Sequence, residues 1–181
     1  MVAQIQTVQD VKLVLPLPSS STPSAIQGLI QIFTAPERTF YVDVIAQAMR
    51  LGGQGTSVCI AQFFKGGIFQ GVKAPRKLGQ NLEWLRSDLS RNISVDADLT
   101  QNEFEAILDL WSYVKYLIAN GNYELVILDE LNLAIERSLI SESEIIDTLK
   151  TRPHKLDIIL TGANMPDSLI NIADQVTKRR R

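Results

Sequence analysis

The chain has 181 residues, of which 45% are apolar and 21% charged, with 18 basic against 20 acidic side chains, as in an ordinary globular protein. This length predicts a single domain that buries a sizeable core without disulfide or metal support. One cysteine, Cys59, and one histidine, His154, exclude a disulfide framework and a zinc knuckle. There is no basic-then-apolar leader and no long apolar run, so we expect a cytoplasmic protein without a membrane span.

Basic residues are concentrated in a C-terminal tail at residues 178–181 (KRRR). The tail holds four of the 18 positive charges, so the rest of the chain is acidic. Nucleic-acid binding needs clustered cations, and we therefore expect no such face on the domain. The tail is interpreted as a solvated terminus rather than an anion-binding arm.

Residues 1–25 differ in composition from the rest of the chain. Pro16, Pro18 and Pro23 alternate with serines and a threonine, which predicts a linker. Before it, residues 8–17 (VQDVKLVLPL) carry enough aliphatic residues to dock as an extended segment, on this chain or on a partner protein. We expect an extended segment and linker at 1–25, an α/β domain at 26–177 and the basic tail.

The domain alternates between short aliphatic runs and amphipathic stretches. The expected elements of its first half are a strand at 28–34, a helix at 41–51 that ends at Gly52-Gly53, a strand at 56–64, a loop at 65–75 and a helix at 80–89. Those of its second half are a helix at 100–120, a buried strand at 125–128, a helix at 142–150 capped by Ser141 and Glu144, a strand at 156–161 and a helix at 166–173. This alternation predicts a doubly wound α/β fold with a mostly parallel sheet.

The helix at 100–120 has the clearest signals at both ends. Thr100 and Glu103 form a reciprocal capping pair, and Asn120-Gly121 mark the stop. Trp111 follows the three-and-four spacing of its apolar face, which predicts a core position rather than a ligand platform.

Ligands of an open parallel sheet bind beyond the carboxyl ends of its strands. The segments that follow the predicted strands are 34–41, 65–67, 129–132 and 161–164. The aliphatic run that ends in Asp129-Glu130 has the form of a Walker B element, in which the aspartate orients Mg²⁺ and the glutamate lies near a phosphate. The alternative is that these acids only cap the helix that follows.

Several segments resemble the P-loop type of ATP:corrinoid adenosyltransferase. They are 126–135 (VILDELNLAI), 158–177 (IILTGANMPDSLINIADQVT), the helix end at Arg50 with Gly53 and Gly55, and 61–66 (AQFFKG). The resemblance implies a P-loop NTPase-like (RecA-like) domain that uses ATP, Mg²⁺ and a corrinoid, and it also implies a homodimer. By carry-over it assigns ligand binding to Arg50, Lys65, Asp129, Glu130, Asn132, Thr161 and Gly162, with Asp129 as a Mg²⁺ ligand if nucleotide binds.

The family's phosphate loop, Gly-x-x-x-x-Gly-Lys-Ser/Thr, falls on residues that cannot reproduce it. Counting back from Arg50, its positions are Ala35, Pro36, Glu37, Arg38, Thr39, Phe40, Tyr41 and Val42. Phe40 stands where the phosphate-binding lysine is expected, and Tyr41 where the Mg²⁺-binding hydroxyl is expected. A phosphate cradle needs converging backbone amides and a cation, so we predict a degenerate Walker A loop that departs from a phosphate nest.

Other departures from the family pattern lie at the same end of the predicted sheet. Ala163 replaces an arginine, Lys178 replaces an acid, and residues 91–99 lack the tryptophan that would pack on the corrin. The surviving polar residues either bind a small anionic or corrinoid ligand or persist as strand-end caps. We assign the structural role to Asn132 and Asn164 and leave both roles open for the others.

Three functions follow from these observations. The first is a divergent relative, a pseudoenzyme that has lost ATP binding and catalysis and acts as a binding or regulatory module, for which no cofactor is expected. The second is an active adenosyltransferase with another mode of ATP binding, and the third is a protein-interaction subunit that uses residues 8–17. The missing lysine and glycines remove several charge-assisted hydrogen bonds of about 1.5 to 3 kcal/mol each, which favours the first.

Overall fold

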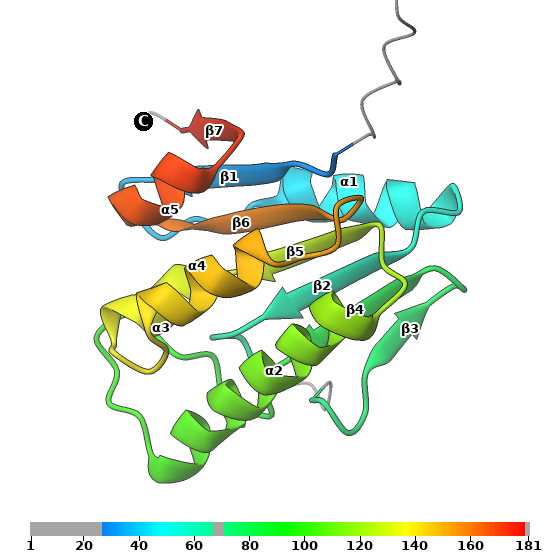
Figure 1. Ribbon diagram of the computed structural model, residues 1–181. Helices are drawn as coiled ribbons and strands as arrows, with labels where there is room; N and C mark the ends of the chain where they lie inside the picture. Colours follow the sequence, from blue (N-terminus) through cyan, green and yellow to red (C-terminus); the bar gives the residue numbers. More distant parts are fainter. Residues whose placement is uncertain (1–26, 67–70, 180–181) are drawn as a thin grey trace, which may run out of the picture.

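The computed structural model describes residues 27–66 and 71–179, and these form a seven-stranded sheet with helices on both faces (Figure 1). In chain order the elements are β1 (Ile30–Ala35), α1 (Val42–Gly53), β2 (Val58–Gln62), β3 (Arg76–Leu78), β4 (Leu82–Arg86), α2 (Gln101–Asn120), β5 (Leu125–Asp129), α3 (Leu131–Glu136), α4 (Glu142–Lys150), β6 (Asp157–Ala163), α5 (Asp167–Ile172) and β7 (Gln175–Lys178). The expected linker and docking segment at 1–25 lie outside the described residues.

The sheet has the strand order β3-β4-β2-β5-β6-β1-β7. β3 is antiparallel to β4 and every other pair of neighbours is parallel, which confirms the predicted doubly wound, mostly parallel sheet. The register pairs Gln62 with Asp129, and Asp129 with Thr161. Polar residues from β2, β5 and β6 therefore lie side by side at the carboxyl edge.

The helices cover the two faces of the sheet unequally. α1 covers one face, while α2, α3, α4 and α5 cover the other (Figure 1). The five residues of β5 are all buried, because this central strand is covered from both sides. The aliphatic run at residues 125–128 is typical of a strand that is buried on both faces.

The predicted start of α2 is confirmed in detail. The Thr100 hydroxyl accepts a hydrogen bond from the Glu103 backbone N–H, and the Glu103 carboxylate accepts one from the Thr100 N–H. Trp111 is buried, with its ring centroid 6.3 Å from that of Phe63. The helix is therefore held by its cap and by core packing, as its sequence indicates.

The helix predicted at 80–89 is wrong, because this segment forms β4 and the turn before it. Leu82 packs with α1 on one face of the sheet, and Leu85 packs in the core on the other face. In a strand, residues three apart point to opposite faces, and both faces are covered here. Buried leucines at this spacing therefore fit a doubly covered strand as well as they fit a helix. The elements β3, α3 and β7 were also not expected from the sequence.

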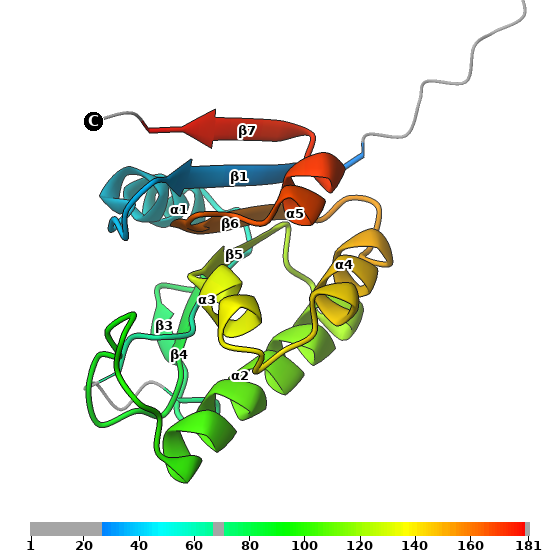
Figure 2. The same cartoon turned by 90° about the vertical axis from the view of Figure 1, so that its left-hand side faces the viewer.

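The basic tail begins inside the sheet rather than after it. Lys178 ends β7, which lies beside β1 at the outer edge (Figure 2). The Arg179 N–H donates to the Thr34 carbonyl, and its guanidinium pairs with Asp43 at 2.8 Å. Lys178 and Arg179 are both exposed, so these contacts do not contradict the interpretation of the tail as a solvated terminus. The sheet nevertheless extends further along the chain than the sequence indicates.

None of the helices in the part of the chain that the structure describes combines the length and the apolar character needed to cross a membrane.

Candidate functional site

Two consecutive acids end the central strand, at the edge where the sequence predicts a ligand site. Asp129 is 2% exposed and Glu130 is 3% exposed. Glu130 has a left-handed backbone, with φ at 66°, and this turn leads from β5 directly into α3. Carboxylates buried this deeply need nearby donors and positive charge.

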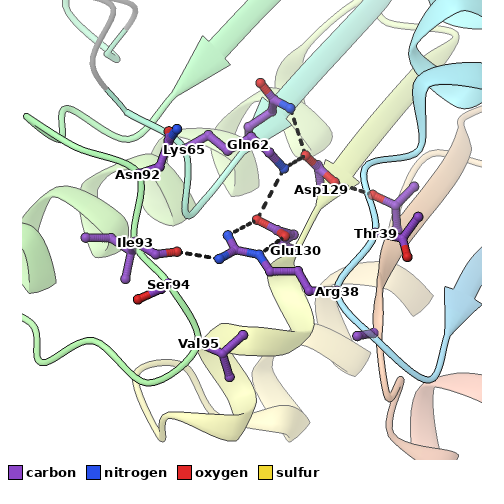
Figure 3. Close-up of polar contacts among 12 residues, drawn as sticks. Arg38, Thr39, Gln62, Lys65, Asn92, Ile93, Ser94, Val95, Asp129 and Glu130 are labelled. Atoms are coloured by element: carbon purple, nitrogen blue, oxygen red, sulfur yellow. Dashed lines mark hydrogen bonds and ion pairs between the residues drawn. The ribbon is translucent and has the colours of Figure 1, made fainter.

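Both oxygens of the Asp129 carboxylate accept hydrogen bonds from side chains of the same chain. Its Oδ1 accepts a hydrogen bond from Thr161 Oγ1 at 2.6 Å. Its Oδ2 accepts from Gln62 Nε2 at 2.7 Å and from the Lys65 ammonium at 2.8 Å (Figure 3). Both oxygens thus have donors, and the charge is compensated by Lys65.

Glu130 is paired with Arg38 from the loop after β1. Arg38 Nη2 donates to Oε2 at 2.6 Å and Arg38 Nε donates to Oε1, so the contact is two-pronged (Figure 3). Lys65 Nζ lies 3.3 Å from the same Oε2. The hydrogen bond to Glu130 raises the pKa of Arg38 above its usual value, so the guanidinium stays charged. Two acids therefore meet two cations, and the cluster carries no net charge.

Arg38 also links the loop after β1 to the segment that precedes α2. Its Nη1 donates to the Ile93 carbonyl at 2.5 Å. In this loop, residues 35–41, no residue has a positive φ. The backbone therefore does not form the alternating right- and left-handed nest that cradles phosphate.

Phe40 and Tyr41 take different positions beside this cluster. Phe40 is 44% exposed, and its ring centroid lies 5.1 Å from Lys65 Nζ, so the aromatic ring covers the ammonium. Tyr41 is buried at the start of α1, with no partner for its hydroxyl. A cavity of about 290 Å³ remains over the cluster, lined by Arg38, Thr39, Phe40, Lys65, Asn92 and Glu130.

These residues do not fit Mg²⁺ and a triphosphate. Mg²⁺ takes oxygen ligands at about 2.0 to 2.1 Å in octahedral geometry, usually one or two carboxylates together with waters and phosphate oxygens. Both oxygens of Asp129 already accept hydrogen bonds from side chains, and the Lys65 ammonium pairs with Oδ2. A phosphate would meet Phe40 instead of a lysine. We therefore derive no chemical step that involves nucleotide at this site.

Asn132 and Gly162 pack directly against each other. Asn132 Nδ2 donates to the Ala163 carbonyl, and a Cβ at position 162 would lie 1.9 Å from Asn132 Oδ1. Asn132 and Gly162 thus contribute to the local packing between α3 and β6, and Asn132 Oδ1 is buried without a hydrogen-bond partner. Asn164, with φ at 48° and its N–H bonded to the Ala35 carbonyl, also serves the turn after β6.

Arg50 is not brought into the cluster. It lies exposed in the last turn of α1, whereas the loop that carries Arg38 precedes the first turn. Arg50 is eight positions after Val42, which places it about 12 Å further along the helix axis.

Gln62 is a site residue that the sequence analysis did not select. Its Oε1 accepts from Trp84 Nε1 and from Arg86 Nε, both at 2.9 Å, and this turns its Nε2 toward Asp129. Gln62 is a polar residue at the end of an aliphatic run, and this pattern could have indicated a position at the carboxyl edge of the sheet. No sequence signal pointed to Trp84 and Arg86, because their segment was predicted to be helical.

A family model and several curated relatives point to one family. The model of the family described as ATP:corrinoid adenosyltransferase BtuR/CobO/CobP matches residues 27–181. The corrinoid adenosyltransferase of Escherichia coli K12 is 25% identical over 154 residues, which are 85% of this chain and 77% of that protein. That of Sinorhizobium sp. is 25% identical over 170 residues, covering 87% of this chain and 74% of the relative. An uncharacterized protein of Nostoc sp. is 44% identical over 64 residues, 35% of this chain, but the match spans only 17% of its length.

Proposed function

This chain belongs to the ATP:corrinoid adenosyltransferase family, and we propose that it is a member that has lost ATP binding and catalysis and acts as a binding or regulatory protein. One observation carries the proposal. The acids that end β5 are neutralised by Arg38 and Lys65 of the same chain. This pairing supports the proposal, because a metal ion would compete with Arg38 and Lys65 for the same carboxylates.

The energetics of the cluster support this proposal. Seating Mg²⁺ on Asp129 would break its hydrogen bonds to Lys65 and Gln62, and bonds to charged groups contribute about 1.5 to 3 kcal/mol each. The loop at 35–41 offers no lysine and no glycine to compensate. Binding of Mg²⁺-nucleotide would therefore break hydrogen bonds and ion pairs of Asp129 and Glu130, and the loop would supply few new contacts to offset this cost.

Calorimetry of the full-length protein with Mg²⁺-ATP tests the loss of nucleotide binding. We expect no binding tighter than about 1 mM, an affinity worth about 4 kcal/mol. Phe40→Lys alone should not restore binding, because the close-approach glycines remain absent. An active member of the family in the same buffer serves as the positive control, and micromolar binding by this chain would overturn the proposal.

A separate titration with a corrinoid tests whether the protein binds this ligand without Mg²⁺-ATP. Binding of the corrinoid without binding of Mg²⁺-ATP supports a corrinoid-binding module. Formation of an adenosylated corrinoid from the two ligands together would instead establish an active enzyme and contradict the proposed loss of catalysis.

We further propose that residues 8–17 recruit a protein partner, and this segment lies outside the described residues. Deleting residues 1–25 should then remove co-purifying partners and leave the melting temperature within a few degrees. A deletion that leaves partner binding unchanged would exclude recruitment. Light scattering of the full chain tests the implied homodimer.

A further inference from the structure

Helix α1 carries two apolar stripes, and the rest of the described chain covers only one of them. The covered stripe packs on the sheet and consists of Val44, Ile45, Ala48 and Gly52. The second stripe is exposed and consists of Val42, Ala46, Met49 and Gly53. Val42 is 60% exposed and Met49 48% exposed, and Figure 1 shows α1 as the helix that covers its side of the sheet alone. A surface helix that packs only on its own core is polar on its outer face, so a continuous apolar stripe there indicates a further contact.

The spacing of the exposed stripe is that of a helix pair. Its four residues are separated by four, three and four positions, which is the a/d pattern of two heptads. Asp43 and Arg50 each follow a residue of this stripe directly, so they occupy equivalent flanking positions one heptad apart. In coiled coils, charged residues that flank the apolar positions pair across the two helices and set their orientation.

The two flanking charges have room for such a partner. Both side chains are exposed. The Arg50 guanidinium makes no hydrogen bond or ion pair with any residue of 27–66 or 71–179. Asp43 contacts Arg179 through Oδ1 and is 56% exposed, so its carboxylate can accept a second donor.

We propose that the exposed stripe packs against the same stripe of a second copy of this chain, with the two α1 helices antiparallel. A two-fold axis near the middle of α1 then sets Ala46 against the partner's Met49, and Val42 against the partner's Gly53. Each larger side chain meets a small residue, which lets the helices approach closely. A parallel pair would instead set every residue against its own copy, small against small.

The same two-fold axis brings opposite charges together. Asp43 lies opposite the partner's Arg50, and Arg50 lies opposite the partner's Asp43, so one isologous contact contains the pair twice. Guanidinium and carboxylate form charge-assisted hydrogen bonds in this arrangement. The stripe contains no residue of the acid cluster at Asp129, so the proposal goes beyond the loss of ATP binding and does not depend on it.

The size of the stripe predicts a weak dimer. α1 has 12 residues and is about 18 Å long. A standard interface involves about 20 to 30 residues on each side, many more than the stripe and its two flanking charges. We therefore expect association that depends on protein concentration in the micromolar range.

Sedimentation velocity of the full-length protein, from about 1 to 200 μM, measures this association, and charge exchange tests its geometry. Arg50→Glu sets two carboxylates against each other in both contacts, so it should weaken the dimer about tenfold or more, which is about 1.4 kcal/mol. Adding Asp43→Lys restores opposite charges and should recover the affinity of the native chain to within about threefold. A double variant that associates no better than Arg50→Glu would refute the antiparallel pairing.

Asp43→Lys also breaks the contact with Arg179, and a separate variant controls for this. Arg179→Met removes the same contact within the chain but leaves both flanking charges of α1 in place. It should leave the dissociation constant unchanged. A loss of association in Arg179→Met as large as that in Arg50→Glu would contradict the assignment to the α1 pair.

Met49→Glu tests the apolar stripe and distinguishes it from any other surface that could form a homodimer. The change places a charge in the centre of the contact and should leave the protein monomeric over the whole concentration range, while an unchanged thermal transition shows that the chain is folded. Tyr116→Glu on α2 is the matched control, because Tyr116 is 61% exposed and lies on a helix of the opposite face. It should leave association unchanged. A native chain that stays monomeric at every concentration, or a dimer that persists in Met49→Glu, would overturn the proposal.

Discussion

Arg38 and Glu130 are 92 residues apart in the sequence and form a two-pronged ion pair, with Nη2 2.6 Å from Oε2 and Nε also donating to Oε1. Arg38 belongs to the loop after β1, onto which the sequence resemblance maps the family's phosphate loop, and Glu130 follows the strand of Walker B form. The loop thus contacts an acid of its own chain, in the place where the resemblance implies a nucleotide. The stability of the fold should depend on this pair.

Arg38→Met should destabilise the protein. It leaves Glu130 buried with only Lys65 nearby, at 3.3 Å, and Arg38 itself is 27% exposed. We expect a loss of about 2 kcal/mol, below the usual cost of removing one partner of a fully buried pair. Urea unfolding followed by circular dichroism measures it. Asp43→Asn, which breaks the exposed pair with Arg179, should cost less than about 1 kcal/mol. Equal effects of the two substitutions would contradict a structural role for the Arg38–Glu130 pair.

Gly162→Ala should be strongly destabilising for a steric reason. The added Cβ would lie 1.9 Å from Asn132 Oδ1, so β6 or α3 must shift, at a cost of about 1 to 3 kcal/mol. Gly53→Ala is the matched control, because no heavy atom lies within 4 Å of its Cβ position and it ends a helix. That change should be neutral or stabilising by up to about 1 kcal/mol. The loss of unfolding free energy caused by Gly162→Ala should be smaller in a variant that also carries Asn132→Ser. An equal loss in both backgrounds would exclude the contact with Asn132 as its cause.

Two tyrosines should respond differently to loss of the hydroxyl. Tyr41 Oη has no partner, so Tyr41→Phe should leave stability unchanged or raise it slightly. Tyr123 Oη donates to Glu83, so Tyr123→Phe should cost about 1 to 3 kcal/mol by leaving a carboxylate oxygen without its donor. Thermal and urea unfolding of the two variants measure the contrast. A destabilised Tyr41→Phe would show that its hydroxyl has a partner, such as an ordered water.

Glu103 should make stability depend on pH. The hydrogen bond from Arg91, and then that from the Thr100 backbone, lower the pKa of Glu103 to about 2. An unfolded-state glutamate titrates near about 4.3, so the carboxylate stabilises the fold above that pH and loses its contribution as pH falls toward the folded value. The difference in unfolding free energy between the native protein and Glu103→Gln should therefore be largest near neutral pH and decline in acid. Glu105→Gln is the exposed control on the same helix, and a difference that stays constant with pH would refute the assignment.

Local signals in the sequence predicted the fold class and most elements. The aliphatic run at 125–128 predicted a strand covered on both faces, because only such a strand needs apolar residues at every position. Thr100 and Glu103 predicted the start of α2, since a capping pair depends on residues three apart. The segment at 80–89 was mispredicted because Leu82 and Leu85 have the same spacing in a helix and in a strand with two buried faces.

The tertiary structure alone decided what the candidate site contains. The sequence placed Asp129 and Glu130 at the carboxyl edge, but it did not show that Lys65, 64 residues away, and Arg38 would neutralise them. The order of strands β2, β5 and β6 brings Gln62, Asp129 and Thr161 into one row, and the loop after β1 then places its arginine against Glu130. Electrostatic pairing acts over a few ångströms in space and leaves no periodicity along the chain, so only the folded arrangement reveals that the acids are already paired.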